Sequence, residues 1–194
     1  MIRIFTKRTH FLIATLALLG NLRAAEPAKP SSPLDGARDA ARKGDFAKAT
    51  ELLKAEAAKG NAEAANALGE LSLAGRGMKA SPAEAVRWFQ QAVDASFPAA
   101  MLNLGMILRK GAEGVPADPD KANFLIHGAA EEGYAPAQVA CGQMAEAGGE
   151  DKGDMPGARA WYEKAAAQGN ADGLLALSRF LDNGLGGPDR KSVV

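Results

Sequence analysis

The sequence is poor in the residues on which most enzymes and metal sites depend. Its 194 residues include one cysteine, Cys141, and two histidines, His10 and His127. A single cysteine excludes an intramolecular disulfide framework and any metal site built from several cysteines. The spaced motifs S-x-x-K, G-x-S-x-G and H-E-x-x-H, and a phosphate-binding glycine loop with lysine, are also missing. We therefore predict that the protein is not an enzyme and has no catalytic residues, metal ligands or cofactor.

An excess of positive charge is missing as well. Lysine plus arginine and aspartate plus glutamate are equal at 23 each, and four of the basic residues lie in residues 1–25, which hold no acidic residue. The rest of the chain is therefore mildly acidic and contains no basic block. Because binding to a phosphate backbone needs a cationic surface, we predict no nucleic-acid partner.

The main apolar run lies near the N-terminus and has the form of a secretory signal. Basic residues up to Arg8 precede the apolar residues 11–22, and the small residues Ala24 and Ala25 follow. Such a run is too short to span a bilayer. We expect residues 1–25 to be a cleaved signal peptide, residues 26–33 to be a linker, and the mature chain to be periplasmic or secreted, without a membrane span. An uncleaved signal that anchors the chain stays as an alternative.

The rest of the sequence repeats itself. An alanine recurs at steps of 36, 37 and 36 residues, preceded by a residue that favours a helix N-cap and followed by two bulky residues and then a small one. The alanines are Ala49, Ala85, Ala122 and Ala158; the caps are Asp45, Ser81, Asp118 and Asp154; the bulky pairs are Leu52-Leu53, Trp88-Phe89, Leu125-Ile126 and Trp161-Tyr162; the small residues are Gly60, Ser96, Gly133 and Gly169.

A second set of small residues recurs between these segments and predicts a partner helix in each unit. It comprises Gly69, Gly105, Gly142 and Ser178, each followed six residues later by a glycine suited to a left-handed helix end. We expect first helices near 62–74, 98–110, 135–147 and 171–183, and second helices near 46–59, 82–95, 119–132 and 155–168. Because one helix pair cannot bury its own apolar face, the pairs must stack. The predicted fold is all-α, a right-handed α-solenoid of stacked antiparallel helix pairs.

This pattern resembles the Sel-1-like repeat family, a relative of the tetratricopeptide repeat. The likeness is carried by Leu68-Gly69, by Gly75-Arg76-Gly77, and by the run from Trp161 to Gly169 with its counterparts. The resemblance implies Sel-1-like repeats over residues 61–187, as three full units and one truncated unit. Residues 34–60 look more like a tetratricopeptide helix pair, and residues 188–194 form a tail.

The family resemblance also implies a function. Proteins with such repeats bind a protein or peptide along the inner face lined by the first helices, so we expect an interaction module, a scaffold or adaptor. The family's groove positions correspond here to Glu63, Asn66, Glu70, Met106, Arg109, Lys110, Gln143, Glu146, Arg179 and Asp182. Some secreted relatives with paired cysteines are described as penicillin-binding or β-lactam-hydrolysing. A cell-envelope hydrolase is therefore the alternative, although this chain lacks those cysteines.

The remaining distinctive residues are interpreted as structural. Cys141 takes the place of a leucine in the other units, which predicts a buried thiol. His127 is expected to face solvent or to fill space, and Trp88 and Trp161 recur at the repeat spacing and are expected in the core.

The last unit stops after its first helix. This leaves Leu174, Leu177, Phe180 and Leu181 without their usual cover. We expect this end to bind a second copy of the chain or a partner, or to be covered by the tail at Val193-Val194.

Overall fold

The computed structural model describes residues 32–148 and 153–187, and within these ranges the chain is helical, with no β-strand. The predicted signal peptide, most of the linker and the C-terminal tail lie outside the described residues. The helices are α2 (Asp35–Arg42), α3 (Phe46–Ala57), α4 (Ala62–Ala74), α5 (Pro82–Asp94), α6 (Pro98–Lys110), α7 (Pro119–Glu131), α8 (Ala135–Ala147), α9 (Met155–Ala167) and α10 (Ala171–Asp182).

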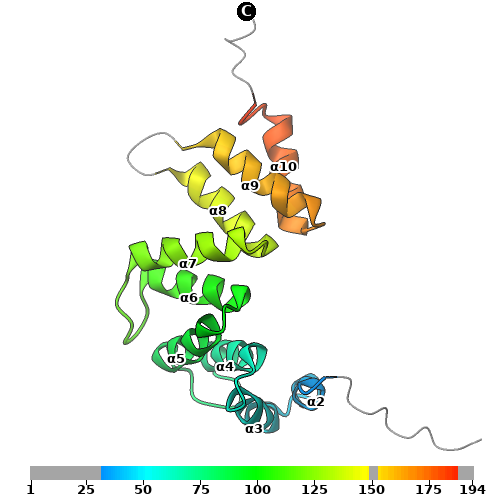
Figure 1. Cartoon of the computed structure of the whole chain (residues 1–194), viewed down its shortest axis with the longest axis vertical. Coiled ribbons are helices and arrows are strands. Elements are labelled where there is room, and N and C mark those ends of the chain that lie inside the picture. Colours follow the sequence, from blue (N-terminus) through cyan, green and yellow to red (C-terminus); the bar gives the residue numbers. More distant parts are fainter. Residues whose placement is uncertain (1–31, 149–152, 188–194) are drawn as a thin grey trace, which may run out of the picture.

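The helices form antiparallel pairs that stack in chain order. Figure 1 shows the stack running along the long axis of the molecule, from α2 and α3 at one end to α10 at the other. Each of the eight helices predicted from the repeat begins at the expected residue, and their ends differ from the prediction by at most two residues. The predicted right-handed α-solenoid is confirmed. In the described part of the chain, no helix combines the length and the apolar character needed to cross a bilayer.

The predicted N-caps explain why the second helices begin where they do. The side chains of Asp45, Ser81, Asp118 and Asp154 each accept a hydrogen bond from the backbone N–H three residues later. Among the first helices, Asn61 and Asn170 cap α4 and α10 in the same way. Each bond satisfies a backbone donor that the helix itself leaves free.

The two helices of each unit meet where a bulky side chain lies against a glycine. A Cβ atom added at Gly69 would lie 2.5 Å from the Phe89 ring, and one added at Gly142 would lie 2.5 Å from the Tyr162 ring. In the middle unit Ile126 occupies the place of the ring, over Gly105. Because glycine lacks a side chain, the helices approach closely enough for these bulky groups to be fully buried. We call this contact the glycine seam.

The structure corrects the prediction for the two tryptophans, each of which is the first residue of its bulky pair. The second residue of the pair fills the glycine seam, whereas Trp88 and Trp161 are half-buried and pack at the edge of the core. One face of the Trp161 ring carries Lys164, whose Nζ lies 3.9 Å from the ring centroid. The two positions face different directions because they are consecutive residues on a helix, about 100° apart.

Ser96 closes α5 in a strained backbone conformation. Its φ is 54°, in the left-handed region where Gly60, Gly133 and Gly169 lie at the equivalent places. A serine pays a steric penalty there because its Cβ crowds the backbone. This helix end therefore carries a backbone strain that the glycines avoid in the other units.

The end of the stack is better covered than the sequence suggested. Phe180 is fully buried and meets the Tyr162 ring edge-on, with 5.2 Å between centroids. Leu177 is half-buried, because α10 packs directly onto α9. The leucines that remain exposed are Leu174 (51%), Leu175 (72%) and Leu181 (54%).

Candidate protein-binding surface

Polar side chains link successive first helices along one side of the stack. We call the surface formed by α2, α4, α6, α8 and α10 the first-helix face. Arg38 of α2 pairs with Glu63 of α4, with 2.7 Å between Nη2 and Oε1. Further links join α4 to α6 and α8 to α10. Five of the ten predicted groove residues take part in these links, namely Glu63, Asn66, Glu70, Glu146 and Arg179.

The link between α4 and α6 is a network of two amides and a carboxylate. Asn66 donates from Nδ2 to Oε1 of Glu70 at 2.8 Å. Asn103 donates from Nδ2 to Oδ1 of Asn66 at 3.0 Å and to the same Oε1 of Glu70 at 3.3 Å. Asn66 is only 7% exposed. Asn66 therefore holds the carboxylate of Glu70 in place and is not itself available to a ligand. This corrects its prediction as a groove residue that contacts the partner.

The link between α8 and α10 is an ion pair reinforced by a hydroxyl. Arg179 donates from Nη2 to Oε2 of Glu146 at 2.6 Å, and the Tyr162 hydroxyl donates to the same oxygen at 2.9 Å. The hydrogen bond from Arg179 lowers the pKa of Glu146, with a smaller lowering from Tyr162. Burial, and secondly the bond to Glu146, raises the pKa of Tyr162 to about 12. The negative charge of Glu146 is therefore balanced by Arg179 and is not available to a ligand.

The middle of the first-helix face combines apolar and basic side chains. Leu73 and Met106 occupy the repeat positions that Glu146 and Arg179 hold further along, and they are 41% and 44% exposed. Arg109, half-buried, and Lys110, exposed, follow at the end of α6. Exposed apolar side chains bordered by charge are typical of surfaces that bind other proteins.

Two clefts open on the first-helix face. The α2–α4 cleft has a volume of about 170 Å³ and is lined by Leu34, Ala37, Arg38, Ala41, Leu53, Glu63, Ala67, Glu70 and Leu71. The α8–α10 cleft is larger, about 630 Å³, and is lined by Gln143, Glu146, Tyr162, Asp172, Leu175, Ala176 and Arg179. Five of the predicted groove residues line these clefts. Asp182 is exposed at the end of α10 and lines neither of them.

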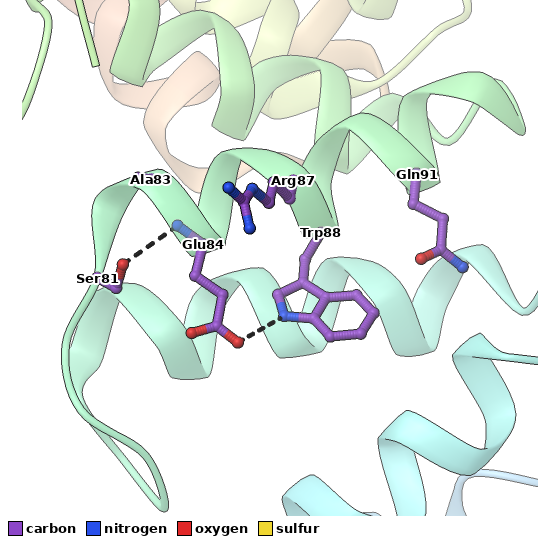
Figure 2. A pocket seen from close by; sticks show the side chains of 6 residues that line it. All are labelled: Ser81, Ala83, Glu84, Arg87, Trp88 and Gln91. Carbon is purple, nitrogen blue, oxygen red and sulfur yellow. Dashed lines mark hydrogen bonds between the residues drawn. The ribbon is translucent and has the colours of Figure 1, made fainter. Parts of the chain in front are cut away.

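A third cavity, of about 450 Å³, was not anticipated from the sequence. It lies on α5 and is lined by Ser81, Ala83, Glu84, Arg87, Trp88 and Gln91. Figure 2 shows Glu84, Trp88 and Gln91 projecting from the same side of the helix, with the Trp88 Nε1 donating to Oε1 of Glu84 at 3.4 Å. The signal that could have revealed it is Glu84, one turn before Trp88, because a charged partner for the indole N–H places that edge of the ring at the surface.

Cys141 and His127 are neighbours, as their positions on α8 and α7 allow. The sulfur lies 3.6 Å from Nδ1 of His127, and Cys141 is 1% exposed. Burial, followed by the charge of Glu131, raises the pKa of the thiol to about 11. The thiol is thus protonated near neutral pH and packs as an apolar group, as predicted. His127 is exposed, in agreement with the expectation that it faces solvent or fills space. Within residues 32–148 and 153–187 no group of three or more potential metal ligands is present.

The three complete helix pairs define the family. The Sel1 repeat model matches residues 62–97, 98–134 and 135–170, which is more than half of the chain. The protein therefore belongs to the Sel1 repeat family. Sel1 repeats generally mediate interactions between proteins, and proteins built from them are generally scaffolds and not enzymes.

Solved structures with the same repeat are similar to this chain. A Sel1 repeat protein from Oxalobacter formigenes is 32% identical, with a TM-score of 0.68 over 76% of this chain and 42% of that one. A protective antigen of uropathogenic Escherichia coli strains with the same repeat fold is 28% identical, with a TM-score of 0.64 over 79% of this chain and 37% of that one.

One curated relative is a fungal protein. Chitin synthase regulatory factor 3 of Schizosaccharomyces pombe is 36% identical over 121 residues, which is 61% of this chain but only 13% of that protein. The chain thus spans a small part of this relative and less than half of each solved structure.

Proposed function

We propose that this protein is an exported interaction module that holds a segment of another protein along its first-helix face. The observation that carries the proposal is how clefts and apolar side chains are arranged along this face. One cleft lies near each end, and the exposed Leu73 and Met106 lie between them. An extended segment that follows the stack would meet apolar, acidic and basic positions in turn. The generally adaptor-like behaviour of Sel1 repeats supports this reading.

Site-specific crosslinking in the native host tests the proposal. A photoreactive amino acid at Met106 places the probe on the first-helix face. The matched control is Phe124 on α7, also apolar and 76% exposed but on a second helix. We expect a discrete adduct from position 106 and none of the same mass from position 124. Equal adducts from both positions, or none from position 106, would contradict the proposed face.

Export is proposed from the N-terminal sequence alone. Basic residues, a short apolar run and small residues at Ala24 and Ala25 have the order of a cleaved signal. We expect the protein purified from its host envelope or medium to begin at Ala25 or Glu26. Terminal sequencing of a chain that still begins at Met1 would favour an anchored protein if it lies in the membrane fraction, and would exclude export if it lies in the cytosol.

We also propose that the exposed leucines of α10 join two copies of the chain. Leu174, Leu175 and Leu181 are each more than half exposed on one helix, which favours burial against an apolar surface. Sedimentation should show an oligomer that Leu181→Gln weakens, a variant that leaves the lining of the α8–α10 cleft unchanged. A monomer at high concentration would remove this part of the proposal without touching the first-helix face.

A further inference from the structure

The α2–α4 cleft differs from the rest of the first-helix face in combining an apolar floor with a fixed carboxylate. Leu34 and Leu53 are buried at its base, and Ala37, Ala41, Ala67 and Leu71 complete the apolar lining. Its volume of about 170 Å³ is of the order of one large aliphatic or aromatic side chain. The cleft is thus dimensioned for a single side chain and not for a small-molecule cofactor.

The cleft lies between α2 and α4. α2 has 8 residues and α4 has 13, and the pair between Arg38 and Glu63 joins them near the start of α4. The lining residues of α2 run from Ala37 to Ala41, with Leu34 just before the helix, and those of α4 run from Glu63 to Leu71. The apolar side chains of the two helices therefore line an opening between them.

Glu70 at the rim carries a negative charge that no cation in the described structure balances. Both of its hydrogen bonds come from neutral amides, those of Asn66 and Asn103, and both reach Oε1. Oε2 has no hydrogen-bond partner among the described residues. The network therefore holds the carboxylate in one position while leaving one oxygen available. A preorganised acceptor of this kind binds a cation with a smaller loss of side-chain freedom.

Arg38, the basic residue among the described lining of the cleft, is already engaged. Arg38 donates to Asp35 at 3.2 Å and to Glu63 at 2.7 Å. The cleft lining thus holds two carboxylates, those of Glu63 and Glu70, and one guanidinium, which is also paired with Asp35 outside the lining. The cleft has a net negative charge, which attracts a basic group and repels an acidic one.

We propose that the α2–α4 cleft binds a protein segment that carries an apolar side chain with a lysine or arginine beside it. The apolar side chain fills the cavity over Leu53, and the basic group reaches Oε2 of Glu70. This proposal rests on the proposed function and names the chemistry of the partner at one end of the first-helix face.

Three matched hexapeptides test the recognition chemistry directly. They are Gly-Ser-Leu-Lys-Ser-Gly, the acidic counterpart Gly-Ser-Leu-Glu-Ser-Gly, and Gly-Ser-Ser-Lys-Ser-Gly, which lacks the apolar side chain. Each is titrated to millimolar concentration into the purified chain while the methyl resonances of Leu34, Leu53 and Leu71 are followed by NMR. We expect saturable shifts at these methyls with the first peptide alone. No shift with it, or equal shifts with the acidic peptide, overturns the proposal.

Two substitutions then separate charge from shape. Glu70→Gln should weaken binding of the Leu-Lys peptide about fivefold, as for loss of one partly exposed ion pair. Ala41→Leu fills the cavity with a good helix former and should weaken binding at least tenfold. Glu113→Gln, which removes the same charge at an exposed loop residue outside the cleft, should change nothing. Unchanged affinity in both cleft variants, with thermal melting confirming their folding, overturns the proposal.

The outcomes also distinguish this proposal from the proposed function. If the crosslinked partner binds the first-helix face but its affinity is unchanged by Glu70→Gln and Ala41→Leu, the assignment of the cleft is wrong. The proposal of an interaction module is then unaffected. If no partner is crosslinked at Met106, both fail. If peptide binding weakens as the protein is concentrated, a second copy of the chain occupies the cleft, which likewise overturns the assignment.

Discussion

The two halves of the first-helix face hold a carboxylate in opposite electrostatic surroundings. In the N-terminal half Glu70 is fixed by two neutral amides, and in the C-terminal half Glu146 is paired with Arg179 and the Tyr162 hydroxyl. The backbone frame beneath them is the same, a glycine seam filled by Phe89 in one half and Tyr162 in the other. The comparison teaches that the repeat fixes where side chains stand, while single residues decide whether a charge is satisfied or available.

Truncating the ring in either half tests whether the glycine seam stabilises both halves of the stack. We expect Phe89→Ala and Tyr162→Ala each to lower the free energy of unfolding by about 3–5 kcal/mol, because both rings are fully buried. Urea denaturation followed by circular dichroism measures this. Trp161→Ala, at a half-buried position, should cost about 1–2 kcal/mol. A larger loss for Trp161 than for Tyr162 would show that the seam has been assigned to the wrong residue.

Replacing Tyr162 by phenylalanine makes the C-terminal unit resemble the N-terminal one. The variant loses the hydrogen bond to Glu146 and should be about 1 kcal/mol less stable at neutral pH. Burial raises the pKa of Tyr162 to about 12, so the unfolded chain loses this proton first, near its ordinary value of about 10. The stabilisation is complete below pH 10 and is lost as the pH rises towards 12. Denaturation at pH 9 and above pH 11 should show this decline in the native chain and a shallower one in Tyr162→Phe.

Exchanging the closing residues of the second helices removes a further difference between the halves. Ser96→Gly removes the steric strain that a side chain causes at this positive φ. It should stabilise the protein by about 0.5 kcal/mol, after the entropy cost of glycine is subtracted. The reverse exchange, Gly133→Ser, should destabilise it by about 1 kcal/mol, because φ is 86° there. Thermal unfolding midpoints report both. A lower midpoint for Ser96→Gly would mean that the serine side chain compensates for its strain.

The smallest expected effect concerns the charge of Glu146. The hydrogen bond from Arg179 lowers the pKa of Glu146, so its contribution is present above the ordinary pKa of about 4.3 and is lost as the pH falls below it. Glu146→Gln should cost about 0.5 kcal/mol at pH 7, since Arg179 is half exposed. Its stability and that of the native chain should converge as the pH falls and Glu146 becomes protonated. A difference that persists in acid would assign the effect to packing and not to charge.

The helix pairs could be predicted because repetition averages out local ambiguity. Asp45, Ser81, Asp118 and Asp154 mark the helix starts, and each does so by a bond to its own helix. Spacing alone could not tell which residue of the pair Trp161-Tyr162 fills the seam, because both are bulky and adjacent. That choice depends on the rotation of the helix against its neighbour.

The candidate surface was predictable in position but not in detail. Glu70 and Glu146 were expected on the inner face, yet their different partners depend on contacts between units, such as the one from Asn103. The burial of Asn66 and the cleft between α2 and α4 depend on how neighbouring helices pack, which the repeat pattern does not encode. The tryptophan cavity on α5 was missed because Trp88 was assigned wholly to the core.

The glycine seam joins the two helices of one Sel1 unit and no others. Each unit therefore carries its own internal contact, and exposed side chains that do not touch the seam can vary without disturbing it. Units of this kind behave as cassettes: the Glu70 surface, with Asn66 and the Asn103 of the next unit, can be transplanted onto another pair of units that keep their own ring and glycine. Gene duplication followed by drift at exposed positions could build new specificities in the same way.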